Sequence, residues 1–128
     1  MKKSLVGAIG GIGMTSKELN LKLVRAIPGI APSYQQEVEW QEGDETGSHV
    51  VYEDVLAPYI RQAAGAGDRD GLDEIFGFIE QLLETGDGYA EEVVALSVLE
   101  SLGQEEKIKN ACLPFIKTKT KKLFSELG

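Results

Sequence analysis

Hydrophobic residues recur along this chain three and four positions apart, the spacing that gathers side chains on one face of an α-helix. The clearest pattern comprises Leu72, Ile75, Phe76, Ile79, Leu82 and Leu83. Weaker patterns of the same period predict further helices over residues 15–27, 32–42, 50–64, 89–102 and 115–127, with a short helical segment at 105–110. Alternating stretches that would indicate strands are short, and residues 50–52 are the best of them.

Local signals mark where some of these helices begin and end. Thr15 and Glu18 form a capping-box pattern that opens the first helix, and the Pro-Gly pair at 28–29 ends it. Pro58 lies inside the 50–64 pattern. Because proline lacks an N–H and clashes with the preceding turn, it predicts a kink or a split in that helix.

The predicted fold is all-α, with five to six helices joined by short loops, so that neighbouring helices run antiparallel. A compact bundle or a short array of stacked helical hairpins, as in a solenoid, fits this pattern. Residues 93–99 are apolar at every position except Ser97, which is too continuous for a helix with one exposed face. We therefore expect that helix at the centre of the domain.

The 128 residues suffice for one domain with its own core, which we assign to residues 15–128. Residues 1–14 contain two lysines and a glycine-rich apolar run, and we expect a flexible segment there. One alternative is a short signal peptide, which the glycines disfavour, and another is a natural start at Met14. The apolar run is far too short to span a bilayer.

Cysteine content and overall composition indicate only the broad class of protein. Cys112 is the single cysteine, so the chain forms no internal disulfide, and its place beside Leu113 is typical of a small core residue. Hydrophobic residues make up 42% of the chain and charged residues 27%, which is typical of a globular protein rather than a disordered or membrane protein. We expect a cytoplasmic protein that contacts no membrane.

Acidic residues concentrate in the middle of the chain. Residues 26–106 hold 19 of the 21 acids and only two bases, Arg61 and Arg69, whereas the whole chain has a net charge of -8. The bases lie mainly outside this region, and six are lysines between Lys107 and Lys122. A body this acidic repels nucleic acids and anionic lipids and attracts a basic partner. The alternative is a solvated surface that only maintains solubility.

Few residues could carry chemistry. His49 is the only histidine and has no accompanying nucleophile motif, so we expect an ordinary loop or capping residue. Asp68, Asp70 and Asp73 lack the remaining ligands of a calcium loop and are expected to cap the helix that follows. We predict no catalytic residue, no metal and no cofactor. An enzyme that uses His49 or an unrecognised carboxylate site is the less favoured alternative.

One segment, between residues 37 and 54, combines many acids with aromatic residues. The candidate partner-binding residues are Glu37, Glu39, Trp40, Glu42, Asp44, Glu45, Glu53 and Asp54. Carboxylates steer and pair with lysine or arginine on a partner, and a tryptophan supplies an anchor that loses its water on binding. The alternative is that Trp40 belongs to the core and the acids only face solvent.

Four stretches of the chain together indicate a family resemblance: LVRAIP at 23–28, VYEDVLAP at 51–58, IFGFIEQLL at 75–83 and VALSVLESL at 94–102. They resemble a largely uncharacterised bacterial family of small helical proteins, over roughly residues 16–125. Some relatives look like immunity proteins that accompany secreted polymorphic or contact-dependent toxins. The matching residues are mainly structural, so no binding residue is carried over from the family.

This resemblance implies a protein that performs no chemistry and blocks one toxin domain, often a basic nuclease, by tight stoichiometric binding. A negative surface that mimics phosphate suits that role. The second hypothesis is a helical adaptor or regulatory module with an unrelated protein partner. The sequence leaves the partner, the toxin's activity and the oligomeric state open.

Overall fold

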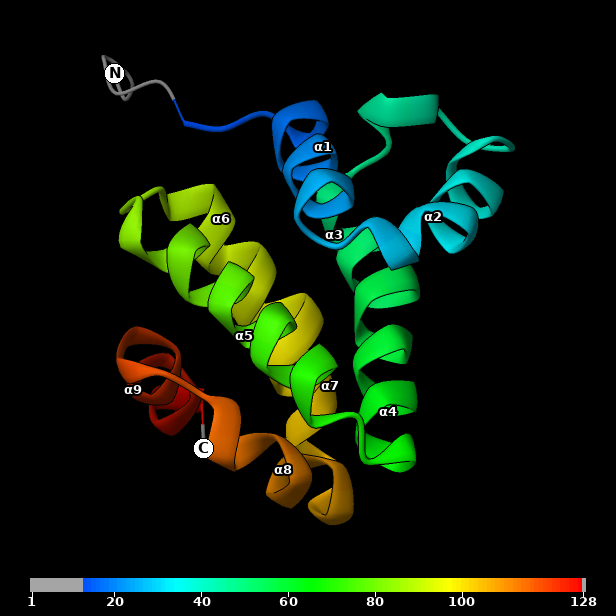
Figure 1. Cartoon of the computed structure of the whole chain (residues 1–128). Coiled ribbons are helices and arrows are strands. Elements are labelled where there is room, and N and C mark those ends of the chain that lie inside the picture. The colour runs from blue at the N-terminus through cyan, green and yellow to red at the C-terminus, as the bar shows by residue number, and fades with distance from the viewer. Residues whose placement is uncertain (1–12, 128) are drawn as a thin grey trace.

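The structure, a computed structural model, describes residues 13–127 (Figure 1). Its α-helices are α1 (Ser16–Ala26), α2 (Ala31–Val38), α3 (Ser48–Val51), α4 (Ala57–Ala66), α5 (Arg69–Glu84), α6 (Gly88–Val93), α7 (Glu100–Gly103), α8 (Glu106–Cys112) and α9 (Thr118–Leu127). Short 3-10 turns between them are η1 (Pro28–Ile30), η2 (Gly43–Glu45) and η5 (Leu113–Phe115). Residues 1–12 and 128 lie outside the described residues, and most of the predicted flexible segment 1–14 lies there with them.

Two long helices contain π-helical segments. The segment η3 (Tyr52–Leu56) joins α3 to α4, and η4 (Val94–Leu99) joins α6 to α7. Residues 48–66 and 88–103 therefore each form one continuous helix. The all-α prediction is confirmed, with seven continuous helices in the described part of the chain.

Pro58 is the second residue of α4, which begins directly after the π segment η3. In η3 the Ala57 N–H donates to the Tyr52 carbonyl, five residues back instead of four. A wider turn of this kind leaves room for the proline ring and does not need the N–H that proline lacks. The helix continues past the proline, so the split that the sequence allowed does not occur. Residues 50–52, the best strand candidate, are helical as well.

Several hydrogen bonds hold the start of α1. Thr15 and Glu18 form the expected capping box, with both of its hydrogen bonds present. Just before them, the Met14 N–H donates to Asp87 Oδ1 at 2.9 Å, and the Met14 side chain packs against the core. This contact ties the start of α1 to the turn that precedes α6.

The middle of the molecule is α5 together with the continuous helix 88–103 (Figure 1). Every residue of the predicted α5 stripe is buried, and Phe76 is fully buried. The apolar run 93–99 is buried as expected, except that Leu96 is 49% exposed. On opposite sides of this centre, α4 and α9 pack against α5.

A buried carboxylate on α5 holds the start of α9. Glu80 accepts hydrogen bonds from the backbone N–H groups of Lys119 (2.8 Å) and Thr120 (3.0 Å) and from the Thr120 hydroxyl (2.9 Å). Backbone N–H groups in a first helical turn have no partner within their own helix. Burial alone would raise the pKa of Glu80, but these hydrogen bonds to its charged form outweigh burial and lower the pKa.

We predict that Phe76→Ala lowers the free energy of unfolding by about 3–5 kcal/mol, because it leaves a cavity at a fully buried position. Urea unfolding followed by circular dichroism measures this loss. Leu96→Ala, at the exposed position of the neighbouring helix, is the control and should change stability by less than about 1 kcal/mol. Equal effects of the two substitutions would contradict the assigned core.

Glu80→Gln should weaken the docking of α9 by about 1–3 kcal/mol at neutral pH, because it removes a charged acceptor from three donors. The pKa of Glu80 in the folded protein lies below its ordinary value of 4.5. The stabilisation is therefore fully present above pH 4.5 and is lost as the pH falls through the pKa that Glu80 has in the folded protein. Urea midpoints between neutral and acidic pH should show this loss in the native protein and not in Glu80→Gln. Glu84→Gln, exposed on the same helix, should behave like the native protein.

Candidate protein-binding surface

The acidic loop, defined here as residues 39–47, is tied to α1 by one fully buried side chain. Asn20 Nδ2 donates to the carbonyl oxygens of Asp44 (3.0 Å) and Thr46 (2.7 Å). The amide oxygen of Asn20 in turn accepts a hydrogen bond from the Ser48 hydroxyl at 2.9 Å. All the hydrogen-bonding groups of this buried amide therefore help to hold the loop and the start of α3 against α1.

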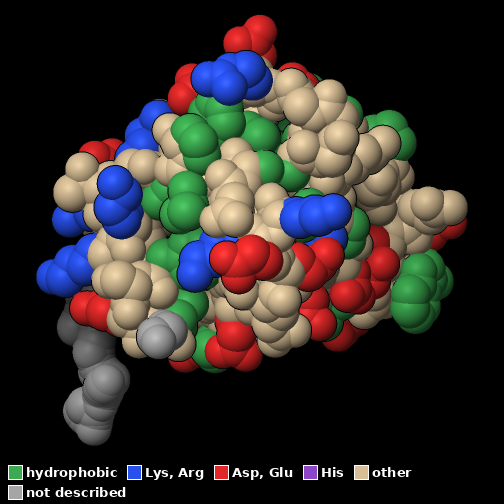
Figure 2. All heavy atoms as spheres, turned by 90° about the horizontal axis from the view of Figure 1, so that it is seen from below, with side chains coloured by type: hydrophobic (Ala, Val, Ile, Leu, Met, Phe, Trp, Pro, Cys, Tyr) green, Lys and Arg blue, Asp and Glu red, His purple; other side chains and the backbone are tan. Residues whose placement is uncertain are grey.

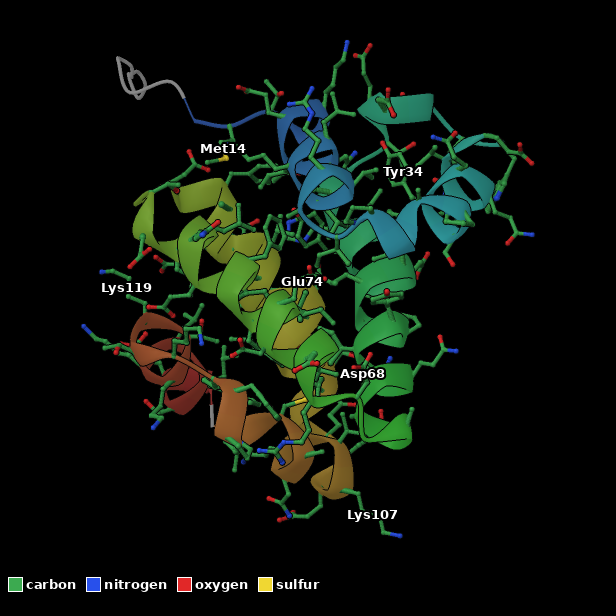
Figure 3. The ribbon with its side chains drawn as sticks, in the orientation of Figure 1. Met14, Tyr34, Asp68, Glu74, Lys107 and Lys119 are labelled. Carbon is green, nitrogen blue, oxygen red and sulfur yellow. The ribbon has the colours of Figure 1, made fainter. Side chains whose placement is uncertain are left out.

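Tyr34 on α2 is a second anchor of the acidic loop, and Figure 3 shows it between α2 and the loop. Its side chain is 1% exposed, and its hydroxyl donates to Asp44 Oδ1 at 2.6 Å. Burial raises the pKa of Tyr34 far above its ordinary value, and the hydrogen bond to Asp44 and its charge raise it further. Tyr34 thus stays a proton donor at neutral pH. Asp44, which the sequence placed among the partner-binding residues, is used inside the protein.

Bonds within the acidic loop complete its folded shape. The Thr46 hydroxyl donates to the Gly43 carbonyl at 2.7 Å and accepts from the Glu42 N–H at 3.2 Å. Gly43 has φ of 62°, a left-handed conformation that glycine adopts without strain. The loop is consequently a closed turn whose outer side chains are presented from an ordered backbone.

Trp40 is the most exposed large hydrophobic residue given by the structure, with 72% of its surface accessible. It lies in the turn directly after α2. The alternative interpretation, in which Trp40 belongs to the core, is therefore wrong. Gln41 Nε2 donates to Glu37 Oε2 at 2.6 Å and, more weakly, to the Glu37 carbonyl at 3.3 Å, which closes the end of α2. The side chains of Glu39, Glu42 and Glu45 are exposed around this turn.

Two carboxyl groups from different elements meet beside this turn. Burial raises the pKa of Glu37, and the charge of Asp54 on η3 and a hydrogen bond with it raise the pKa further, while the hydrogen bond from Gln41 lowers it. A positive side chain of a partner placed between Glu37 and Asp54 would relieve their repulsion. Glu53, the neighbour of Asp54 on η3, is exposed as well.

We call the acidic surface the set of predicted residues that the structure leaves available to a partner: Glu37, Glu39, Trp40, Glu42, Glu45, Glu53 and Asp54. They come from α2, the acidic loop and η3, and α2 is in contact with η3. Asp44 is the one member of the predicted set whose carboxylate is turned inward.

His49 joins α3 to the continuous helix 88–103. Its Nδ1 lies 2.9 Å from Ser97 Oγ and its Nε2 lies 3.0 Å from Glu92 Oε2, while its ring stands edge-on to Tyr89. Ser97 is 2% exposed and lies on the inner side of the histidine, whereas the carboxylate of Glu92 is on the solvent side. A serine so placed is poorly positioned to reach a substrate, so this geometry favours a polar contact between helices over nucleophilic catalysis.

The remaining candidate sites have ordinary surroundings. Asp68 caps α5 as predicted, with its Oδ1 accepting from the Gly71 N–H at 3.0 Å. Between residues 13 and 127, no group of three or more His, Cys, Asp or Glu side chains is placed to hold a metal ion. Burial raises the pKa of the Cys112 thiol to about 11, so the thiol is protonated at neutral pH. Nor does any helix in this range have the length and apolar character needed to cross a membrane.

Sequence reasoning missed the residues that position the acidic loop. Asn20 lies three and seven positions before Leu23 and Ile27, so it shares their buried face of α1. A polar amide within an apolar stripe is the signal that could have identified it, because a buried amide needs hydrogen-bond partners. Tyr34 gave a weaker signal, since tyrosine is common at helix positions that are partly buried.

Together these features define a small all-α protein that presents an acidic surface on an anchored loop. The family model described as "Domain of unknown function (DUF7674)" matches residues 20–127, and the chain belongs to this family. The match begins at Asn20 and includes the whole acidic loop. Comparison with curated proteins and with solved structures gave no match.

We predict that Asn20→Ala releases the acidic loop without unfolding the protein. The substitution removes three hydrogen bonds and leaves the two loop carbonyls without this donor, which should lower the free energy of unfolding by about 1–3 kcal/mol. Amide hydrogen exchange at Glu45 and Thr46 should accelerate by about tenfold or more, since the loop opens locally more often. Asn110→Ala, at the exposed second asparagine, is the control. Unchanged exchange in the loop would show that Asn20 does not anchor it.

Proposed function

We propose that this protein is a cytoplasmic immunity-type protein that neutralises a basic toxin domain by binding it in a stoichiometric complex through the acidic surface. The single observation that carries this proposal is Trp40, which is 72% exposed in the turn that begins the acidic loop, while hydrogen bonds at Asp44 and Thr46 hold the loop in place. A tryptophan side chain is normally covered for the most part, and an exposed one with carboxylates near it in sequence suits a basic partner.

Trp40 and the anchored acidic loop together explain how the protein would bind its partner tightly. Trp40 supplies a large apolar area that a partner can desolvate, as tryptophans do at binding hot spots. Because Asn20 and Tyr34 already hold the loop, little conformational entropy is lost when the loop binds. The surrounding carboxylates speed the encounter with a positively charged partner and set its orientation.

The acidic surface also suits the active face of a nuclease toxin. Such an enzyme attracts the phosphates of its substrate with lysines and arginines, and carboxylates spaced over a rigid surface compete for the same groups. In this proposal Glu37 and Asp54 receive one basic side chain between them, because their mutual repulsion falls when a positive charge enters. Asp44 takes no part in the contact, since its carboxylate accepts from Tyr34.

The sequence resemblance to immunity proteins supports a toxin as the partner. The acidic surface supports a partner with positive charge. The family itself carries no assigned function. The same surface would serve a helical adaptor equally well if its basic partner were not a toxin. The identity of the captured partner therefore separates these two roles, whereas the binding chemistry is common to both.

We predict that reversing three exposed charges of the acidic loop weakens partner binding by about a hundredfold and flattens its dependence on salt. The partner is first captured from cells of the native host, purified and titrated by calorimetry at low and high salt. The loop variant carries Glu39→Lys, Glu42→Lys and Glu45→Lys. A charge-matched control variant carries Glu74→Lys, Glu84→Lys and Glu106→Lys, which are exposed on other elements.

The control variant should bind nearly as tightly as the native protein. Equal affinity of the loop variant and the native protein at low salt would exclude the acidic loop as the binding surface. Expression of the captured partner alone should arrest growth, and co-expression of the native protein should restore it. A partner with no toxic effect would identify the protein as an adaptor instead.

A further inference from the structure

A second exposed surface lies where α8, η5 and α9 meet. A hollow of about 200 Å³ there is lined by Lys109, Leu113, Ile116, Lys121, Phe124 and Ser125. We call it the basic groove. Figure 2, viewed from below the molecule, shows hydrophobic side chains lying between lysine and arginine side chains on one part of this face, with acids gathered on another.

The basic groove combines an apolar floor with positive edges. Leu113 is 40% exposed, and Lys109 Nζ lies 5.5 Å from the centre of the Phe124 ring. Among the described residues, the salt bridges involve neither Lys109 nor Lys121. A neighbouring hollow shares Lys109 and Phe124 and adds Leu127, which is 37% exposed, and one acid, Glu100. The groove thus offers apolar surface and positive charges available to a ligand.

The size and charge of the basic groove favour one large apolar side chain flanked by carboxylates. Its volume lies below the range of about 300–1,000 Å³ typical of pockets for small molecules. Positive edges select an occupant that carries negative charge beside its apolar part. This same chain presents such a group, because Trp40 stands exposed between Glu39 and Glu42 on the acidic loop.

The acidic loop and the basic groove lie far apart on one molecule. In Figure 1 α2 is at the upper right, while α8 and α9 are at the bottom and lower left. Figure 3 shows the same separation between Tyr34, which anchors the loop, and the labelled Lys107 and Lys119. The loop therefore cannot fill the groove of its own molecule. Contact between them requires two copies, joined by different surfaces in a head-to-tail manner.

We propose that the basic groove binds the acidic loop of a second copy of this chain, with Trp40 seated on Phe124 and Leu113 and with carboxylates beside Lys109 and Lys121. The assembly is reversible and grows head to tail, because each added copy uses one of its two surfaces and presents the other to the next copy. It forms without any other protein and does not depend on the toxin partner.

This contact would give the protein a storage form. The loop in the assembly is the loop that the proposed function assigns to the partner, so a loop seated in a groove cannot bind that partner. Adding the partner should then dissolve the assembly into one-to-one complexes. Loss of the basic groove should leave affinity for the partner unchanged or slightly higher.

The test is analytical ultracentrifugation of the full chain with two complementary variants. Trp40→Ala disables the loop, and Lys109→Glu with Lys121→Glu disables the groove. A control with the same change of charge carries Lys22→Glu and Arg25→Glu, which line a different hollow between α1 and α5. Circular dichroism checks that each variant keeps its helical content.

The average mass of the native protein should rise with concentration beyond that of a dimer at low salt, and this association should weaken by about tenfold or more at high salt. The control should associate like the native protein. Each complementary variant alone should stay monomeric. Their equimolar mixture should form a dimer and no larger species, because one variant supplies the only intact loop and the other the only intact groove.

A native protein that stays monomeric at all concentrations would overturn the proposal, as would a mixture of variants that does not dimerise. Self-association of the groove variant equal to that of the native protein would show that another surface is used. These outcomes are separate from the proposed function, since none of them involves the toxin partner. Partner binding by the groove variant tests that function independently.

Discussion

The hydrogen bonds of the Asn20 side chain are the constraint on which the binding surface depends. A buried amide is costly unless its donors and its acceptor are all paired, and here the partners are two loop carbonyls and the Ser48 hydroxyl. The loop must therefore adopt one backbone path to satisfy the amide. That path turns Asp44 inward to Tyr34 and leaves Trp40 outside.

The helical body places charges of opposite sign at distant positions. Helix α5 and the continuous helix 88–103 form the core, and the loop anchored to α1 carries acids on one side of it. On the other side, Glu80 caps the start of α9 and so fixes the position of its lysines. Here a carboxylate on one helix accepts hydrogen bonds from the first N–H groups of another helix. Such bonds orient the two helices more firmly than apolar contact alone. The acidic surface and the basic groove are thus held by polar bonds inside the body.

Much of the fold could be predicted because its signals are local. The stripe around Phe76, the capping box at Thr15 and the cap at Asp68 depend on residues within a few positions of each other. The π segment before Pro58 was not predicted, because a proline inside a helical pattern also fits a kink or a break. The extra width of a π turn depends on how the whole helix packs.

The binding site was predictable only in part, because its geometry depends on contacts distant in sequence. The cluster of acids around Trp40 is evident from the sequence. The exposure of the tryptophan could not be predicted, since the same pattern fits a core residue. The inward turn of Asp44 and the meeting of Glu37 with Asp54 require α1, α2 and η3 to be packed first. Asn20 and Glu80 interrupt apolar stripes, and such interruptions indicate buried polar contacts without identifying their partners.

Hydrogen–deuterium exchange of the free protein and of its complex with the captured partner measures directly whether the acidic surface is the binding site. We predict that protection on binding concentrates in peptides covering residues 37–54, with little change across α5 and α9. Protection confined to α5, α8 or α9, with the acidic loop unchanged, would contradict it.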